Sequence, residues 1–151
     1  MELSKDIREF IELLLSQKVE FLLVGGYALA IHGAPRFTED IDFLIRVSPD
    51  NAERMESVLR SFGFGQIGIT RADFLVPEHV IQLGRAPNRI DLLTSMSGVS
   101  WEEAWVSKEE VEFGGFQLWT VSRNVLIQNK KASGRPQDLA DVARLEQRST
   151  L

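Results

Sequence analysis

The sequence predicts an α/β (α+β) domain in which a small mixed β-sheet is flanked by helices and followed by C-terminal helices. Two observations support this prediction. Strand and helix patterns mix through the first half of the chain, and a hairpin pattern with two helix patterns follows in the second half. A length of 151 residues suits one domain over 1–151, with a core in about 1–121 and C-terminal helices in about 122–148.

The first half of the chain alternates between helix and strand patterns. Apolar residues at helical spacing indicate helices, and alternation of polar and apolar residues indicates half-buried strands. Ser48 is a suitable N-cap for a helix, Pro49 fits its first turn, and Gly63 would end it. The predicted segments are a helix at 3–16, a strand at 21–24, a short helix at 27–32, a strand at 40–46 and a helix from 49 to about 62.

The second half is expected to begin with short strands and to end with helices. Gly114 and Gly115 would form the turn of a hairpin. Ser122 is a suitable N-cap for the next helix, which Gly134 would end, and Pro136 would begin the last one. The predicted segments are strands at 66–70, 80–83 and 89–93, a hairpin at 111–121, and helices at 122–131 and 136–148.

The composition excludes several classes of protein. The chain has a formal net charge of −5, which argues against non-specific electrostatic binding of nucleic acid. No apolar run approaches the roughly 20 residues of a membrane helix, and the N-terminus MELSKDIREF is too charged for a signal peptide. There is no cysteine, so thiolate metal sites are excluded. A cytoplasmic location without membrane contact is the expectation.

Three aspartates lie within predicted strands. Asp40 and Asp42 are two residues apart, so their side chains would lie on the same face of the strand. Asp91, between Ile90 and Leu92, has a similar setting on a later strand. Like charges raise each other's pKa unless a positive group lies between them, and Mg²⁺ (or Mn²⁺) with its preference for oxygen ligands would serve. Convergence of the three acids would create a metal site for phosphoryl transfer.

A glycine pair, Gly25 and Gly26, follows the first predicted strand and opens a helix. Its backbone N–H groups would be able to approach a phosphate closely. In a purely structural alternative, the glycines only form a turn, Asp40 caps or closes a loop, and Asp42 pairs with Arg36 or Arg89. The order and spacing of the elements together favour the functional interpretation, because a buried charge is costly unless it is paired or metal-bound.

The segment VGGYALAIHGAPRFTEDIDFL, residues 24–44, resembles the signature of the nucleotidyltransferase superfamily related to DNA polymerase beta. That signature is an apolar residue, Gly-Gly or Gly-Ser, about a dozen residues, and Asp-apolar-Asp; here thirteen residues separate Gly26 from Asp40. The surrounding pattern is similar to small bacterial proteins grouped with the AbiEii toxin of abortive-infection and toxin–antitoxin systems. These often carry a later lysine and an Arg-x-x-Asp-x-x-Asp stretch, which here would be Lys130 and RPQDLAD at 135–141.

The resemblance implies a nucleotidyltransferase fold and a set of site residues. Asp40, Asp42 and Asp91 would be catalytic and would bind Mg²⁺ (or Mn²⁺), and Gly25 and Gly26 would hold the triphosphate of a nucleoside triphosphate such as ATP. An acceptor would attack the α-phosphate and release pyrophosphate, with Asp91 helping to deprotonate it. The acceptor stays open between protein, RNA and small molecule. Many catalytic members have Gly-Ser where this chain has Gly-Gly, so a serine hydroxyl is missing.

Two basic residues are further candidates for nucleotide binding. Lys130, near the end of a helix with one apolar face, would reach a phosphate or complement the charge of the helix C-terminus. Arg36 precedes the acidic strand and would meet phosphates or Asp42. The residues Arg135, Asp138 and Asp141 are expected to form a structural ion network that joins the last helix to the sheet.

Three functions fit this pattern. The first is a Mg²⁺-dependent nucleotidyltransferase, which the presence of all three acids favours. The second is a non-catalytic nucleotide-binding or regulatory module on the same fold, since little chain remains beyond the core to bind an acceptor. The third is an antitoxin-like protein that binds a partner. A protein partner or a homo-oligomer is compatible with each of them.

Overall fold

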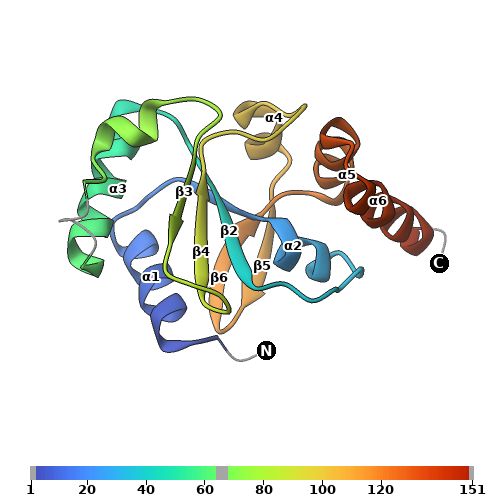
Figure 1. Cartoon of the computed structure of the whole chain (residues 1–151), viewed down its shortest axis with the longest axis horizontal. Helices are drawn as coiled ribbons and strands as arrows, with labels where there is room; N and C mark the ends of the chain where they lie inside the picture. The colour runs from blue at the N-terminus through green and yellow to red at the C-terminus, as the bar shows by residue number, and fades with distance from the viewer. Residues whose placement is uncertain (1–2, 64–67, 150–151) are drawn as a thin grey trace.

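A mixed β-sheet forms the centre of the molecule (Figure 1). The computed structural model describes residues 3–63 and 68–149, and these form six strands in the order β3-β4-β2-β1-β6-β5. The strands are β1 (Phe21–Val24), β2 (Asp40–Ile45), β3 (Val80–Leu83), β4 (Arg89–Leu93), β5 (Glu109–Phe113) and β6 (Phe116–Thr120). The pairs β2·β4 and β1·β6 are parallel and the other three are antiparallel. The predicted mixed sheet flanked by helices is therefore confirmed.

Helices α3 (Pro49–Phe62) and α5 (Arg123–Ser133) begin and end at the capping residues that predict them. The Ser48 hydroxyl accepts a hydrogen bond from the Asn51 backbone, and Gly63 ends that helix in the left-handed conformation. Ser122 caps the next long helix in the same way. The helices are α1 (Lys5–Ser16), α2 (Gly25–Ile31), α3 (Pro49–Phe62), α4 (Trp101–Val106), α5 (Arg123–Ser133), α6 (Pro136–Ser149) and a 3₁₀ helix, η1 (Arg71–Leu75). None of them is long and apolar enough to cross a membrane.

The prediction of a strand at 66–70 is not supported. Residues 66 and 67 lie outside the described residues, and residues 68–70 are not in a strand. Thr70 and Asp73 instead form a reciprocal capping box at the start of η1, which commits the backbone to a helical turn. Helix α4 was not predicted as an element, and α2 begins at the glycine pair rather than at Tyr27.

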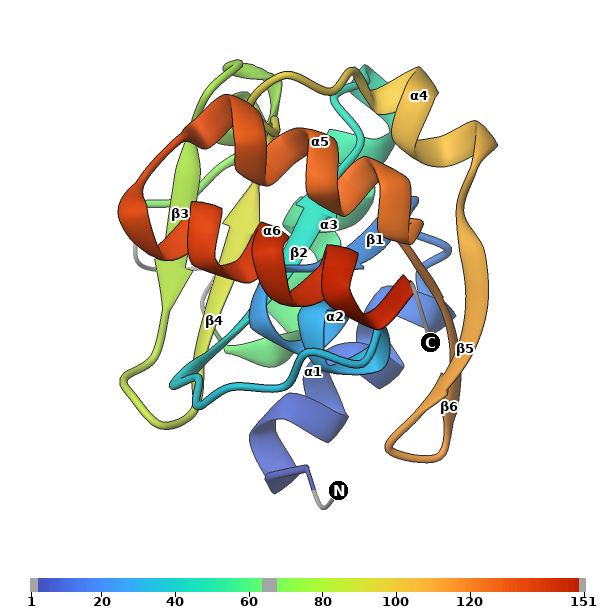
Figure 2. The same ribbon diagram turned by 90° about the vertical axis from the view of Figure 1, so that its right-hand side faces the viewer.

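Helices cover both faces of the sheet and create two cores (Figures 1 and 2). Helices α1 and α3 pack on one face, whereas α2, α5 and α6 lie on the other, where α5 and α6 cross in front of the sheet in Figure 2. In β2, Ile41 and Phe43 join the first core and Leu44 joins the second. Asp40 and Asp42 share the face of Leu44, so two acids occupy sheet positions that apolar residues fill elsewhere.

Candidate active site

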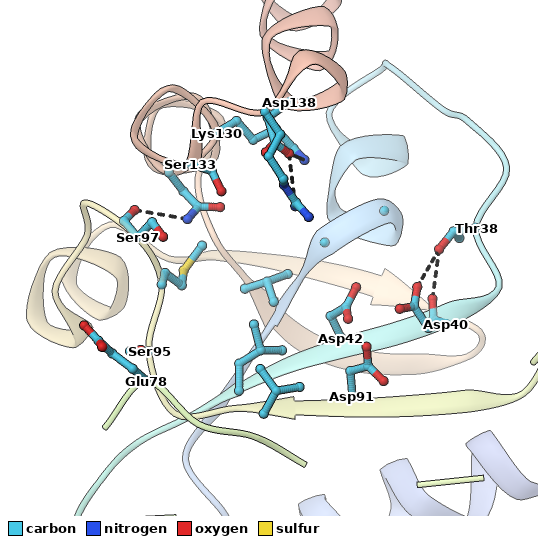
Figure 3. Close-up of a pocket in the computed structure, with 18 of the residues that line it drawn as sticks. Thr38, Asp40, Asp42, Glu78, Asp91, Ser95, Ser97, Lys130, Ser133 and Asp138 are labelled. Atoms are coloured by element: carbon cyan, nitrogen blue, oxygen red, sulfur yellow. Dashed lines mark hydrogen bonds and ion pairs between the residues drawn. The ribbon is translucent and has the colours of Figure 1, made fainter. Parts of the chain in front are cut away.

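Three acids and one arginine form a square on neighbouring strands. Strands β2 and β4 run parallel, and their register places Asp40 beside Arg89 and Asp42 beside Asp91. Residues two apart on a strand lie on the same face, so all four side chains project from one side of the sheet. Figure 3 shows the three carboxylates close together at the edge of the cleft described below.

The carboxylates converge closely enough to share a cation. One oxygen from each of Asp40, Asp42 and Asp91 lies within 4.8 Å of the other two. Hard divalent cations such as Mg²⁺ and Mn²⁺ prefer oxygen ligands of this kind. The donor set therefore fits the ion that the sequence predicted, and the two acidic segments that are distant in sequence do meet in space.

Arg89 bridges two of the three carboxylates. Its Nη2 donates to Asp40 Oδ2 at 2.7 Å, and its Nε donates to Asp91 Oδ1 at 2.9 Å. The structural alternative in which Asp42 pairs with Arg36 or Arg89 is therefore wrong for the described residues: Arg89 bonds its two neighbours, and Arg36 bonds an acid on α6. The register explains this, because Arg89 lies beside Asp40 and on the same face as Asp91.

The three acids differ in their electrostatic settings. Burial, together with the charges of Asp40 and Asp91, raises the pKa of Asp42 to about 7. Burial alone would raise the pKa of Asp40, but hydrogen bonds from Asp91, Thr38 and Arg89 outweigh it and lower that pKa. The pKa of Asp91 is raised by burial, which Arg89 offsets only in part. The site therefore carries uncompensated negative charge around Asp42, where a cation would be stabilised.

A threonine that the sequence reasoning missed supports the first acid. The Thr38 hydroxyl lies 2.9 Å from Asp40 Oδ1 and 3.1 Å from the Asp40 carbonyl oxygen. A Cβ at Gly26 would lie 2.9 Å from the Thr38 Cβ and 3.0 Å from its hydroxyl oxygen. Glycine at 26 therefore leaves room for Thr38, and a hydroxyl is present beside the carboxylates although the glycine pair contains no serine.

Gly25 is required for two independent reasons. Its φ of +71° lies in the left-handed region, which residues with a side chain rarely adopt. A Cβ at this position would also lie 2.0 Å from Asp42 Oδ2. The backbone therefore approaches the carboxylate more closely than any other residue type allows.

Replacing Gly25 with alanine is expected to destabilise the protein and to displace Asp42. The matched control is Gly63→Ala, because Gly63 also has a positive φ but a Cβ there meets none of the described residues within 4 Å. The control should lose about 1–2 kcal/mol from backbone strain, and Gly25→Ala should lose at least about 1 kcal/mol more from the overlap. Urea unfolding of both variants measures the difference, and equal losses would contradict the steric argument.

A cleft of about 1090 Å³ opens over the carboxylates. Its sheet side contains the glycine pair and the three acids, and its other end contains residues from the segment just before β3 and from the segment between β4 and α4. The opposite side comes from α5 and α6, which contribute Lys130, Ser133 and Asp138 (Figure 3). The cleft is large enough for a ligand of nucleotide size, since small-molecule pockets commonly measure about 300–1,000 Å³.

Lys130 lies on this cleft but is already engaged in ion pairs. Its Nζ is 3.0 Å from Asp141 Oδ2 and 3.6 Å from Asp138 Oδ1, and its side chain is 8% exposed. Arg36 Nε lies 3.2 Å from Asp141 Oδ1, and Arg135 Nε lies 2.8 Å from Asp138 Oδ2. The predicted ion network is present, but it joins α6 to α5 and to the segment before β2 rather than to the sheet.

Comparisons with known proteins agree with the fold and the glycine–acid pattern. Residues 13–88, half of the chain, match the family model described as nucleotidyl transferase AbiEii toxin, type IV TA system. No curated protein sequence matches the chain. The matched segment contains the glycine pair, Asp40 and Asp42, and it ends shortly before Asp91.

Three solved structures share the fold at low sequence identity. A candidate nucleotidyltransferase from Thermotoga maritima aligns with a TM-score of 0.53 and 15% identity over 95% of this chain and 86% of its own. The lincomycin-bound lincosamide antibiotic adenylyltransferase LnuA aligns with a TM-score of 0.53 and 13% identity over 97% of this chain and 98% of its own. An antigenic nucleotidyltransferase-like protein from Paracoccidioides brasiliensis aligns with a TM-score of 0.50 and 16% identity over 96% of this chain and 78% of its own. With this fold and with half of its length matched by the family model, the chain belongs to the AbiEii nucleotidyl transferase family.

Proposed function

We propose that this protein transfers a nucleoside monophosphate from a nucleoside triphosphate to an acceptor in a Mg²⁺-dependent reaction, as part of a toxin–antitoxin-type system. The observation that carries this proposal is the convergence of Asp40, Asp42 and Asp91 at the edge of a nucleotide-sized cleft. Membership of the AbiEii family supports the general reaction and the biological setting.

Each side of the cleft has a role in this proposal. The three acids hold Mg²⁺ (or Mn²⁺), which when bound neutralises the charge of the phosphates and polarises them. The backbone N–H groups of Gly25 and Gly26, which both line the cleft, contact the triphosphate. Lys130 of α5 and Arg36 of the segment before β2 also line the cleft and contribute positive charge to the phosphates.

The proposed chemistry is an in-line displacement. An acceptor oxygen attacks the α-phosphorus, the bond between the α-phosphorus and the bridging oxygen to the β-phosphate breaks, and pyrophosphate leaves. Asp91 receives the acceptor's proton, a role that agrees with the raised pKa of this buried carboxylate. The residues of this chain thus orient the triphosphate and hold the proton.

ATP is the first nucleotide to test. The fold neighbour LnuA is described as an adenylyltransferase, and the alignment covers 98% of its chain, so this fold at about this length accommodates adenylyl transfer in that protein. The acceptor is to be sought among proteins, RNA and small molecules. The acidic balance of the chain, −5 in formal net charge, makes RNA the least favoured of these.

Thermal melting with nucleotides tests the proposal directly. Wild type is melted with ATP, GTP, CTP or UTP, each with and without Mg²⁺, beside Asp42→Asn and the exposed-site control Asp50→Asn. A ligand at a hundredfold excess over its Kd stabilises the folded state by about 2.7 kcal/mol, which raises the midpoint. We expect a Mg²⁺-dependent rise in wild type and Asp50→Asn that Asp42→Asn lacks.

The other outcomes point to the alternative functions. A shift that requires Mg²⁺ and Asp42 but is never followed by pyrophosphate release with any acceptor indicates a nucleotide-binding module. If no nucleotide shifts the midpoint, the transferase proposal is wrong. The next experiment would then ask whether a protein partner co-purifies and whether that complex survives Asp42→Asn.

A further inference from the structure

Arg89 occupies the position that a cation would take between two of the proposed metal ligands. Its guanidinium bonds Asp40 Oδ2 at 2.7 Å, Asp91 Oδ1 at 2.9 Å and Asp91 Oδ2 at 3.2 Å. These contacts use one oxygen of Asp40 and both oxygens of Asp91. Asp42, the third acid of the cluster, is the one that Arg89 does not bond.

The guanidinium and a divalent ion would therefore compete. A charged hydrogen bond to a carboxylate is strong, and an ion that shares those oxygens must weaken or replace it. The two cations would also repel each other at the distances that separate these side chains. A free metal ion thus meets a site in which two of its three ligands are already engaged.

The geometry allows Arg89 to move away without unfolding. Its side chain is 35% exposed, and it is the first residue of β4, directly after the β3–β4 loop. It also lines the same cleft as the glycine pair. A guanidinium released here would find phosphate oxygens of a bound nucleotide within the cleft, and its planar fork matches such oxygens well.

We propose that Arg89 is a gate on the metal site. In the metal-free protein it holds Asp40 and Asp91 together, and when a metal–nucleotide complex binds it releases these carboxylates and moves to the phosphates. This inference rests on the proposed function, because it assumes that the three acids hold a metal. It predicts that the free metal binds weakly and that nucleotide and metal bind as a pair.

Titration with Mn²⁺ alone, followed by calorimetry or by the electron paramagnetic resonance signal of the free ion, tests the gate. Arg89→Gln removes the competing charge and should bind Mn²⁺ roughly tenfold more tightly than wild type in the absence of nucleotide. The same variant should bind Mg²⁺–ATP roughly tenfold more weakly, because a phosphate contact is lost. Arg85→Gln, which removes an exposed charge from the adjacent loop, should match wild type in both titrations.

The outcomes separate this inference from the proposed function. If folded Arg89→Gln binds Mn²⁺ no more tightly than wild type, the gate is wrong, whereas Mg²⁺-dependent nucleotide binding can still stand. If neither protein binds Mn²⁺ in the absence of nucleotide, the gate is wrong, and the melting experiment with Mg²⁺ and nucleotide decides the proposed function separately. Tighter Mn²⁺ binding by Arg89→Gln without nucleotide binding by any variant supports the competition between Arg89 and the metal, but it contradicts both the movement of Arg89 to phosphates and the transferase. If Arg89→Gln does not fold, Arg89→Lys should tighten Mn²⁺ binding several-fold, because an ammonium contacts fewer of these oxygens, and unchanged affinity would overturn the gate.

Discussion

Asp42→Asn is expected to stabilise the metal-free protein at pH 8 while it removes Mg²⁺-dependent nucleotide binding. Burial and the neighbouring acids raise the pKa of Asp42 from 3.8 to about 7, so the folded state favours its protonated form. Asparagine has nearly the same shape and no charge. The substitution therefore removes an electrostatic cost of the fold together with a proposed ligand of the metal.

The sign of the pH dependence follows from the direction of the shift. Because the pKa is higher in the folded state, the folded protein binds more protons, and its free energy of unfolding falls as pH rises from about 4 to about 7. Each pKa unit corresponds to about 1.4 kcal/mol, and partial solvent access reduces the total, so we expect a loss of about 2–4 kcal/mol. Asp91 has a shift in the same direction, whereas the lowered pKa of Asp40 contributes stability that is lost only in more acidic solution.

Urea unfolding in the presence of a chelator, at pH 5, 7 and 8, measures this effect. Wild type should lose stability across this range, and Asp42→Asn should lose less and be the more stable protein at pH 8. Asp50→Asn, which removes an exposed acid at the start of α3, should follow the wild-type profile. Parallel profiles of unfolding free energy against pH for wild type and Asp42→Asn would show that the charge of Asp42 does not destabilise the metal-free protein.

Replacing Lys130 with methionine is expected to destabilise the protein strongly. Lys130 is 6% exposed and pairs with Asp138 and Asp141, which are 3% and 2% exposed. Methionine fills similar space but leaves these acids with only their arginine partners. Removing one member of a buried ion pair typically costs about 3–5 kcal/mol where a buried charge is left uncompensated, and the remaining arginines should bring the loss toward the lower end of that range.

The adjacent lysine provides the control. Lys131 pairs with Glu146, but its side chain is 57% exposed, so Lys131→Met should lose less than about 1 kcal/mol. Denaturant unfolding of the two variants gives the comparison. A small loss for Lys130→Met combined with weaker nucleotide binding would instead assign Lys130 mainly to the phosphates.

Local sequence patterns were sufficient to predict most of the elements. Ser48, Pro49 and Gly63 defined α3, because capping depends on residues within one turn of the helix end. Strand β1 and the turn at Gly114 and Gly115 followed from short-range periodicity in the same way. The strand predicted at 66–70 was an error, because it rested on a short apolar pattern. A capping box formed by Thr70 and Asp73 starts the 3₁₀ helix η1 there instead.

That Asp40 and Asp42 share a face could be predicted from the sequence, because the alternation along a strand is a local property. It also indicated Asp91 as a third acid of the same kind. The three-dimensional structure was needed to show that β2 and β4 are parallel neighbours, in a register that places Asp91 beside Asp42 and Arg89 beside Asp40. Strand order and register depend on packing between segments about fifty residues apart. No local pattern could therefore predict that Arg89 bonds Asp40 and Asp91, or that Arg36 bonds Asp141 rather than Asp42.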